Sequence, residues 1–327
     1  MAPSLGKKGS YVFQNYDRAL SILLPYLNFQ SKILDVGCGT GNLIHYLVRK
    51  GYDQAVGVDM SAIYVDEAQK KGVPVRRGKA EELPFDNQMF DAVIMEQVLE
   101  HVINPARAFK EARRVLKNNG ILFVGVPDAA RYGDIRFFDF YWLLIREHIQ
   151  HFDIHHLNAL AGYGGFELLQ NQRNEHVLLN GKMSMPNLSA IYRSGRCCGL
   201  SRLVCKNDLA FRFEKYLAHE SGCLSQKREK IKKLEKSGRP VCVWGIGREF
   251  LYLYESAGLK NCKITALIDA NFHKQKFSKI NGMPVAPPSI LRTADEDSVL
   301  LITATAYVED IKRAIRNYDF NGKIMTL

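Results

Sequence analysis

From residue 31 onwards, short and almost wholly apolar runs alternate with stretches whose apolar residues recur every three or four positions. The apolar runs predict strands that are buried on both faces of a parallel sheet, and the other stretches predict amphipathic helices. Seven predicted strands lie at residues 32–36, 55–59, 73–77, 90–95, 121–127, 164–169 and 186–193. Strands that alternate with helices in this way predict a seven-stranded α/β sheet with helices on both faces.

The same alternation starts again in the last third of the chain. Four further strands, predicted at residues 241–248, 263–269, 298–303 and 323–327, indicate a second and smaller Rossmann-like α/β domain. Residues 208–236 are highly charged and carry apolar residues at helical spacing. We therefore expect an N-terminal helical segment at 1–30, a first α/β domain at 31–195 with an insertion at 128–160, a basic helical linker at 196–238, and a small α/β domain at 239–327.

The composition fits a folded protein of two domains, since 46% of the 327 residues are hydrophobic and 24% are charged. No apolar run reaches the roughly 20 residues that span a bilayer, and the first residues lack the apolar core of a signal peptide. We therefore expect a cytoplasmic protein without a membrane partner. The seven cysteines form no C-x-x-C pair, so reduced thiols are expected.

The net charge of +11 is concentrated in one segment of the chain. Residues 193–239 hold thirteen Lys and Arg against five Asp and Glu. A solvated helix face is the preferred explanation for this surplus. The alternative is a basic surface for an anionic partner, such as a nucleotide diphosphate or a nucleic acid.

A glycine-rich turn joins the first predicted strand to the first helix of the sheet. Gly37, Gly39 and Gly41 permit a sharp turn and let a ligand lie close to the backbone. Dinucleotide-binding loops read G-x-G-x-x-G, whereas this loop reads G-x-G-x-G and follows an acid, Asp35. An acid at this place repels a pyrophosphate and attracts a ligand with an amino group and a positive sulfur. S-Adenosylmethionine has this chemistry.

Further acids follow the ends of neighbouring strands. Asp59 ends the second strand, where a carboxylate can accept both hydroxyl groups of a ribose, and Met60 can pack on an adenine ring. Glu81 and Glu96 follow the third and fourth strands. Ligands of open α/β sheets bind at the carboxyl ends of the strands, so these acids are expected to share one site with Asp35.

These motifs resemble the class I S-adenosylmethionine-dependent methyltransferases. Their first motif, D-x-G-x-G-x-G, is matched at residues 35–41, and residues 78–85 resemble their loop G-D-A-E-x-L-P-F, with Lys79 in place of the aspartate. The resemblance implies a Rossmann-like fold, S-adenosyl-L-methionine as cofactor and methyl-transfer activity. The residues that it implies for cofactor binding are Asp35, Gly37, Gly39, Gly41, Asp59, Met60, Ala80, Glu81 and Glu96.

A class I domain followed by a small domain resembles the sugar-nucleotide C-methyltransferases. Glu147 and His148 match the E-H of their Y-x-E-H motif, Ile145 stands at the tyrosine position, and His101 matches a second histidine on the substrate side. The resemblance implies His148, Glu147 and His101 as catalytic residues, with a histidine as base and Glu147 as its support. The N-terminal zinc-binding domain of that family has no counterpart in this sequence.

The predicted function is methyl transfer to a small molecule, with a sugar or nucleotide sugar as acceptor and with carbon or oxygen as the methylated atom. Two alternatives stay open: a binding protein that keeps the fold without turnover, and a methyltransferase that acts on nucleic acid. The second is not favoured, because no N-P-P-Y type motif or RNA-binding module is recognised. His151, Asp153, His155 and His156 have the chemistry of metal ligands, but no metal is expected.

Overall fold

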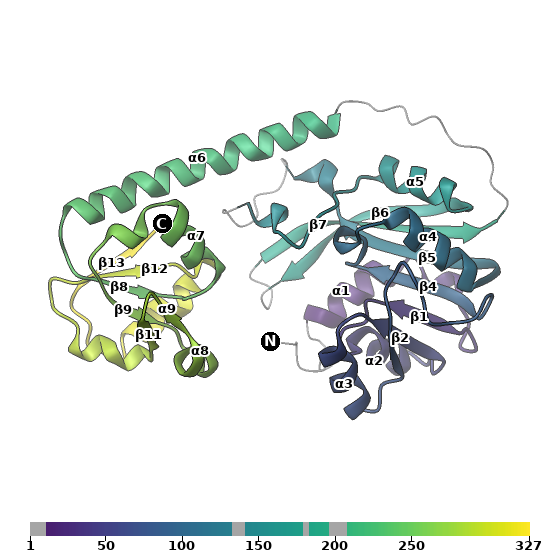
Figure 1. The fold of residues 1–327 in the computed structure, drawn as a ribbon, viewed down its shortest axis with the longest axis horizontal. Coiled ribbons are helices and arrows are strands. Elements are labelled where there is room, and N and C mark those ends of the chain that lie inside the picture. The colour runs from purple at the N-terminus through teal and green to yellow at the C-terminus, as the bar shows by residue number, and fades with distance from the viewer. Residues whose placement is uncertain (1–10, 133–140, 179–182, 196–207) are drawn as a thin grey trace. The chain divides into compact units, whose positions relative to one another are not determined.

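The computed structural model describes residues 11–132, 141–178, 183–195 and 208–327, and these form two compact units (Figure 1). The first unit contains the described residues up to Lys215, except 141–142, and the second contains 141–142 and 216–327. The division between the units therefore falls inside the long helix α6 (Asp208–Lys236). Residues 1–10 of the expected N-terminal segment, 133–140 of the expected insertion and 196–207 of the expected linker lie outside the described residues.

The first unit is built on the predicted seven-stranded sheet, in the order β3-β2-β1-β4-β5-β7-β6. Its strands are β1 (Ile33–Val36), β2 (Ala55–Asp59), β3 (Val75–Arg77), β4 (Phe90–Glu96), β5 (Leu116–Pro127), β6 (Phe166–Leu178) and β7 (Met183–Ser194). The first five strands run parallel, and β7 lies antiparallel to both β5 and β6. The α/β fold expected for this part of the chain is confirmed.

Helices cover both faces of this sheet (Figure 1). They are α1 (Tyr11–Leu20), α2 (Asn42–Arg49), α3 (Ala62–Lys70), α4 (Pro105–Val115) and α5 (Ile154–Tyr163), with short 3-10 turns η1 (Leu24–Tyr26), η2 (Leu99–His101), η3 (Ala129–Arg131) and η4 (Trp142–Leu144). One hydrophobic core joins α1, α2 and α3 to the sheet and contains Leu20 and Leu47. The other joins α4 and α5 to the sheet and contains Phe109 and Leu157. The two cores therefore explain why most strands are apolar on both sides.

Two helices of this unit, α3 and α4, begin at residues whose side chains cap them. Oγ of Ser61 accepts the backbone N–H of Tyr64 at the start of α3. Oδ1 of Asn104 accepts the N–H of Arg107 at the start of α4, whose first residue is a proline. Both caps satisfy backbone donors that the helix itself leaves unpaired. The carboxyl ends of β2 and β4 are thereby followed by helices with fixed starting points.

Hydrogen bonds join helix α1 to the edge strand β6. Nδ2 of Asn15 donates to the carbonyl oxygen of Val177 at 2.7 Å, and the N–H of Val177 donates to Oδ1 of Asn15 at 2.8 Å. Nε2 of Gln172 donates to the carbonyl oxygen of Arg18 at 2.7 Å. The two bonds of Asn15 occupy backbone groups of Val177, at a sheet edge that would otherwise be open to another chain. They also fix α1 on the face where the glycine-rich turn lies.

The second unit contains a six-stranded sheet in the order β10-β11-β9-β8-β12-β13. Its elements are β8 (Val241–Trp244), α7 (Arg248–Ser256), β9 (Ile264–Ile268), α8 (Phe272–Phe277), β10 (Lys279–Ile280), β11 (Met283–Ala286), β12 (Val299–Ile302), α9 (Val308–Ile315) and β13 (Lys323–Thr326). Four strands were predicted, and the hairpin of β10 and β11 was not. Its turn places Asn281 and Gly282 at positive φ. Strands this short leave no apolar alternation in the sequence.

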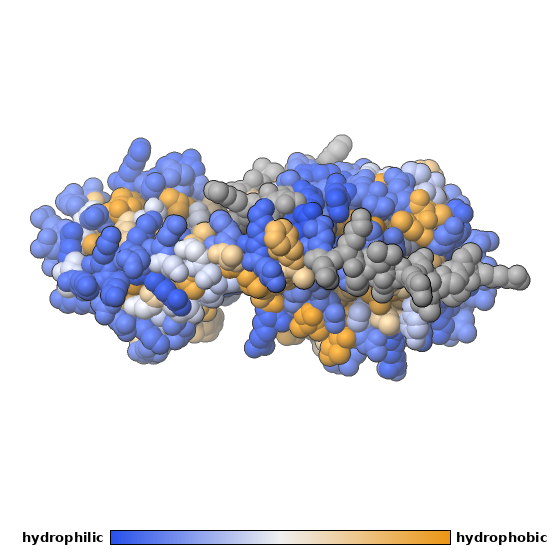
Figure 2. Space-filling model, turned by 90° about the horizontal axis from the view of Figure 1, so that it is seen from above, coloured by the Kyte–Doolittle hydropathy of each residue, from blue (hydrophilic) through white to orange (hydrophobic). Residues whose placement is uncertain are grey.

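Hydrophilic side chains predominate on the face shown in Figure 2, where hydrophobic ones form separate groups. Within the described ranges, no helix has both the length and the hydrophobicity that crossing a bilayer requires.

Candidate functional site

Three glycines in left-handed conformation form the turn between β1 and α2. Gly37, Gly39 and Gly41 have φ angles of 72°, 53° and 83°. A Cβ atom on Gly37 would lie 2.6 Å from Cγ2 of Val98, and one on Gly41 would lie 2.6 Å from Cγ1 of Val73. A Cβ atom on Gly39 would meet no described atom within 4 Å. Gly37 and Gly41 are therefore required for packing, while Gly39 borders open space that a ligand can fill.

The carboxylate of Asp59 joins the end of β2 to this turn. Its Oδ2 accepts the backbone N–H of Gly39 at 2.8 Å, and its Oδ1 accepts that of Ser61 at 2.8 Å. Each carboxylate oxygen has a second lone pair, so Asp59 can still accept hydrogen bonds from a ligand. Met60, the next residue, leaves 67% of its surface exposed beside the turn.

Two more carboxyl groups lie buried beside the glycine-rich turn. Burial, together with the charges of Asp59 and Glu96, raises the pKa of Asp35 well above its ordinary value. Burial also raises the pKa of Glu96 to about 8. Among the described residues, neither carboxylate oxygen of Glu96 has a hydrogen-bond partner. A positively charged ligand would stabilise the ionised form of both groups, so this part of the site is suited to a cation.

The surroundings of Glu96 contain groups that the sequence analysis missed. A Cβ atom on Gly125 would lie 1.6 Å from Oε2 of Glu96, so β5 needs a glycine where this side chain crosses it. Nδ1 of His176 on β6 lies 3.8 Å from Oε1 of Glu96, and burial lowers the pKa of this histidine to about 4. Burial and the charges of Asp35 and Glu96 raise the pKa of Tyr16 on α1. A glycine inside the apolar run of β5 was the available signal for this cluster.

The segment after β3 carries two further residues that were predicted for cofactor binding. Ala80 is buried, and Oε1 of Glu81 accepts the backbone N–H of Asn104 at 3.4 Å. Lys79, which replaces the expected aspartate, is exposed and pairs through its backbone with Glu82. The segment therefore keeps a folded turn in spite of the replaced residue.

A second group of side chains forms where η2 meets the segment after η4. Glu100, His101 and His148 offer ligand atoms that all lie within 4.8 Å of one another. The rings of His101 and His148 meet edge to face, with 4.9 Å between their centroids. Nδ1 of His101 lies 2.7 Å from the carbonyl oxygen of Glu147, whose side chain is exposed. Glu147 thus contacts this group through its backbone, and His101 and His148 lie together as expected of one site.

The buried member of this group, Glu100, was not among the predicted residues. It is 1% exposed, and burial raises its pKa to about 8. Burial, with smaller contributions from His101 and His151, lowers the pKa of His148 to about 4. Both shifts favour the uncharged forms, as expected for groups withdrawn from water. Glu100 directly precedes His101 in the sequence, and this position was the available signal for it.

The histidines that follow in the sequence have structural partners. Oδ1 of Asp153 accepts the backbone N–H of His156 at the start of α5. The same oxygen lies 2.7 Å from Nδ1 of the His156 ring. His151 packs against the rings of Tyr132 and Phe213. Over the described ranges, Glu100, His101 and His148 are the one group of three side chains with the chemistry and spacing of metal ligands.

Residues 9–171 match the family model described as a methyltransferase domain. This region is a class I, S-adenosylmethionine-dependent methyltransferase domain. The match covers β1 to β5, the glycine-rich turn, Asp59 and the group of Glu100, His101 and His148.

Known proteins resemble parts of this domain. An uncharacterised protein of Methanocaldococcus jannaschii is 37% identical over 95 residues, which are 29% of this chain and 44% of that protein. A ubiquinone biosynthesis O-methyltransferase of Azorhizobium caulinodans is 38% identical over 99 residues, which are 28% of this chain and 39% of that protein. A crystal structure titled as an S-adenosylmethionine-dependent methyltransferase from Methanosarcina mazei has a TM-score of 0.43 and 22% identity, over 54% of this chain and 97% of that one. The chain covers less than half the length of these curated relatives.

The side chains of the methyltransferase domain fit S-adenosylmethionine. The open space beside Gly39 leaves room for a ligand against the backbone. Asp59 keeps free lone pairs at the end of β2. Glu96, whose oxygens accept no hydrogen bond from any described residue, favours a cation. The predicted cofactor residues Asp35, Gly39, Asp59 and Glu96 lie around the carboxyl ends of β1, β2 and β4.

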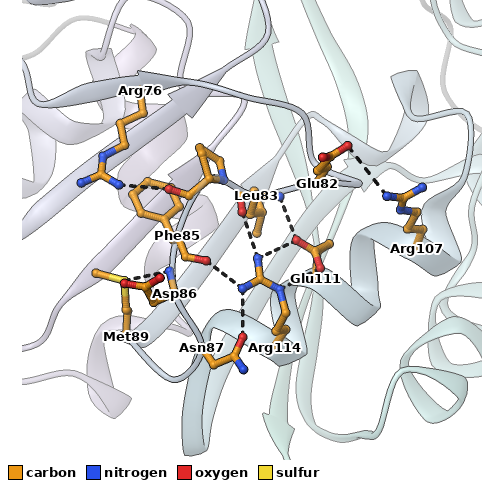
Figure 3. Close-up of polar contacts among 11 residues, drawn as sticks. Arg76, Glu82, Leu83, Phe85, Asp86, Asn87, Met89, Arg107, Glu111 and Arg114 are labelled. Carbon is orange, nitrogen blue, oxygen red and sulfur yellow. Dashed lines mark hydrogen bonds and ion pairs between the residues drawn. The ribbon is translucent and has the colours of Figure 1, made fainter.

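One arginine fixes the loop that follows β3 in the methyltransferase domain (Figure 3). The guanidinium of Arg114 on α4 forms a two-point ion pair with Glu111, at 2.8 and 2.7 Å. It also donates to the carbonyl oxygens of Leu83 and Phe85, at 2.9 and 2.7 Å, and to Oδ1 of Asn87 at 3.0 Å. Because a guanidinium holds five donors in one plane, it can join all these acceptors at once.

Asp269 in the second unit accepts two backbone hydrogen bonds, as Asp59 does in the first, but it also binds a lysine. Oδ2 of Asp269 after β9 accepts the N–H of Ile246 at 3.0 Å, and Oδ1 accepts that of Asn271 at 2.9 Å. Nζ of Lys274 also donates to Oδ2 of Asp269, at 2.8 Å. The lysine therefore takes an acceptor site that Asp59 leaves open. A ribose hydroxyl is therefore not expected to bind at Asp269.

Proposed function

We propose that this chain transfers a methyl group from S-adenosylmethionine to a small-molecule acceptor. The arrangement of Gly39 and Asp59, with buried Asp35 and Glu96 beside it, is the observation that supports this proposal. When bound, S-adenosylmethionine supplies a methyl group that is already activated by its positive sulfur. The chain has to hold the cofactor, place the acceptor in line with the methyl group and promote loss of the acceptor's proton.

We place the acceptor beside His101 and His148. His101 ends the turn η2 after β4, and His148 lies beside it. Val98, in the same segment after β4, packs against Gly37 of the glycine-rich turn. His148 and His101 are the residues proposed to promote loss of the proton. Glu147 is proposed to position His101, since its carbonyl oxygen holds Nδ1 of that ring.

A sugar or a nucleotide sugar is the acceptor that we propose, because the order of domains and the E-H pair resemble the sugar-nucleotide methyltransferases. The named relatives favour a second class of acceptor. They include ubiquinone biosynthesis O-methyltransferases and a 2-methyl-6-phytyl-1,4-hydroquinone methyltransferase. A phenolic hydroxyl or ring carbon is therefore the alternative to a sugar.

Two other functions predict different results in the same assays. A binding protein with this fold would take up the cofactor and transfer nothing. A nucleic-acid methyltransferase would use the basic residues of α6 and the segment before it, and its affinity for RNA or DNA would fall steeply with salt.

Calorimetry and mass spectrometry together test the proposal. We expect S-adenosylhomocysteine to bind the full chain and a nicotinamide cofactor not to bind. Incubation with S-adenosylmethionine and panels of nucleotide sugars, sugars, quinols and RNA should then add the mass of one methyl group to a member of the sugar panels. Failure to bind S-adenosylhomocysteine would refute the cofactor assignment, and a methylated quinol or RNA would replace the proposed acceptor class.

A further inference from the structure

The first unit contains a buried carboxyl group, that of Glu100, which accepts no hydrogen bond from any described residue. Glu100 is 1% exposed, and its two oxygens have no hydrogen-bond partner elsewhere among the described residues. Only its own backbone N–H favours the ionised form, and the charge of Glu96 opposes it. A buried carboxyl group in this condition either stays protonated or is compensated by a cation. The neighbours of Glu100 decide between these states.

Each neighbouring histidine has a ring nitrogen that is free to bind a ligand. A carbonyl oxygen can only accept, so Nδ1 of His101, 2.7 Å from the oxygen of Glu147, carries a proton in the neutral ring. Nε2 of His101 then has its lone pair free, and it lies 3.9 Å from Oε1 of Glu100. The ring of His148 is hydrogen-bonded to the backbone of Leu143, while its Nδ1 is buried without a described partner. The lone pair of Nδ1 is therefore also free.

We propose that Glu100, His101 and His148 bind one divalent transition-metal ion. Their ligand atoms lie within 4.8 Å of one another, and metal–ligand bonds of about 2.1 Å would bring such atoms to within roughly 4 Å. Small side-chain rotations are enough to close this difference, since His101 is exposed and free on one side. The proposal concerns a binding site that is additional to the cofactor site, and it does not depend on the proposed methyl transfer.

The three proposed ligands, and the hydrogen bond that orients one of them, favour a transition-metal ion. Two imidazole nitrogens and one carboxylate suit Zn²⁺, Fe²⁺ or Co²⁺ better than Mg²⁺ or Ca²⁺, which prefer oxygen ligands. Histidines that bind metals usually donate their other N–H to a carbonyl or carboxylate, as His101 does to Glu147. Three protein ligands leave further coordination positions for water or a ligand oxygen.

Binding of Co²⁺ to the full, untagged chain tests this site, because the absorption spectrum of the ion reports its ligands. After treatment with a chelator, we expect the chain to bind one Co²⁺ per molecule without the charge-transfer band of a thiolate ligand. Zn²⁺ should displace it and should raise the unfolding temperature of the chain. Glu100→Gln, which keeps the size of the side chain, and His148→Ala should each weaken Co²⁺ binding more than tenfold.

His155→Ala is the matched control, since this exposed histidine lies in the same part of the chain and outside the group. We expect it to bind Co²⁺ as the unaltered chain does. Circular dichroism confirms that each variant is folded before its affinity is measured. The proposal is overturned if the unaltered chain binds no Co²⁺, if its spectrum shows a thiolate ligand, or if Glu100→Gln and His148→Ala keep full affinity. In any of those cases Glu100, His101 and His148 do not form a metal site.

Discussion

The backbone N–H of Gly39 donates to Oδ2 of Asp59 at 2.8 Å, so a hydrogen bond joins the glycine-rich turn to the end of β2. Gly39 is also the glycine of this turn that borders open space. We therefore propose different roles for the two residues in cofactor binding: Asp59 offers hydrogen-bond acceptors, and Gly39 leaves space for the ligand.

Replacing Asp59 should weaken cofactor binding. Asp59→Ala removes the acceptors proposed for the ribose hydroxyls, and leaving such hydroxyls unpaired costs about 1–3 kcal/mol. Calorimetry with S-adenosylhomocysteine measures the loss. Asp269→Ala is the control, because Asp269 holds the equivalent backbone contacts in the second unit but is bonded to Lys274. Equal affinity in the unaltered chain and Asp59→Ala would remove the ribose contact from the proposed site.

Replacing Gly39 by a larger residue should exclude the cofactor by occupying its space. Gly39→Val adds a side chain where no described atom lies within 4 Å, so the loss of affinity reports the ligand and not protein packing. Gly72→Val is the control, since Gly72 also has a positive φ and no described atom near its Cβ position. Both variants place a valine at a positive φ, which strains the backbone in each. Only Gly39→Val is expected to lose binding of S-adenosylhomocysteine, and a similar loss in both would point to strain alone.

The stability of the ligand-free chain should fall as the pH rises from about 6.5 to 8. The pKa of Glu96 is about 8 in the folded chain and lower when unfolded, so the folded state binds more protons in this window. The contribution of Glu96 is complete at low pH and is lost towards pH 8, by up to ~1.4 kcal/mol per pH unit. His176, with its pKa lowered to about 4, titrates below this window in the folded chain.

Glu96→Gln tests this pH dependence, because it keeps the shape of the side chain and removes its titration. Urea unfolding at pH 6.5 and pH 8 should show a smaller loss of stability in the variant. Glu100, whose pKa is likewise raised to about 8, and Asp35, whose pKa is also raised, remain in both proteins, so a residual slope is expected. An unchanged slope in Glu96→Gln would mean that Glu96 is ionised in the folded chain.

Replacing Arg114 should loosen the loop after β3. A lysine at this position cannot reach Glu111 and the carbonyl oxygens of Leu83 and Phe85 at the same time. We expect Arg114→Lys to destabilise the chain by about 1–3 kcal/mol, the cost of leaving such acceptors unpaired. Urea unfolding measures this loss. The neighbouring Arg113→Lys is the control and should stay within about 0.5 kcal/mol of the unaltered chain.

Replacing His148 should lower turnover and spare the cofactor. Loss of a group that promotes proton removal typically costs a factor of 10² to 10⁴ in rate, and we expect His148→Ala to fall in this range. Its affinity for S-adenosylhomocysteine should stay unchanged. Methyl transfer to the identified acceptor, measured by mass spectrometry, gives the rate. If His101→Ala loses turnover and His148→Ala does not, the decisive residue is His101.

Much of the fold and of the cofactor site could be predicted from the sequence. Some features depend on neighbouring residues only. They are the apolar runs of β1, β2 and β4, the turn at 37–41 and the acid that ends β2. Strand and turn preferences act over a few positions, and the carboxyl ends of parallel strands must share one edge of the sheet. Asp35 and Asp59 could therefore be predicted as candidate cofactor residues without knowledge of the packing.

Only the tertiary structure decided which distant side chains meet. It buries Glu100 beside His148, places His176 of β6 near Glu96, and bonds Asn15 of α1 to the edge of the sheet. It also puts Lys274 on the acid that corresponds to Asp59 in the second unit. These contacts depend on how separate elements pack and on which polar groups lose water in doing so. The periodicity of apolar residues cannot predict how elements pack or which polar groups lose water, because each element shows the same pattern whichever partner it packs against.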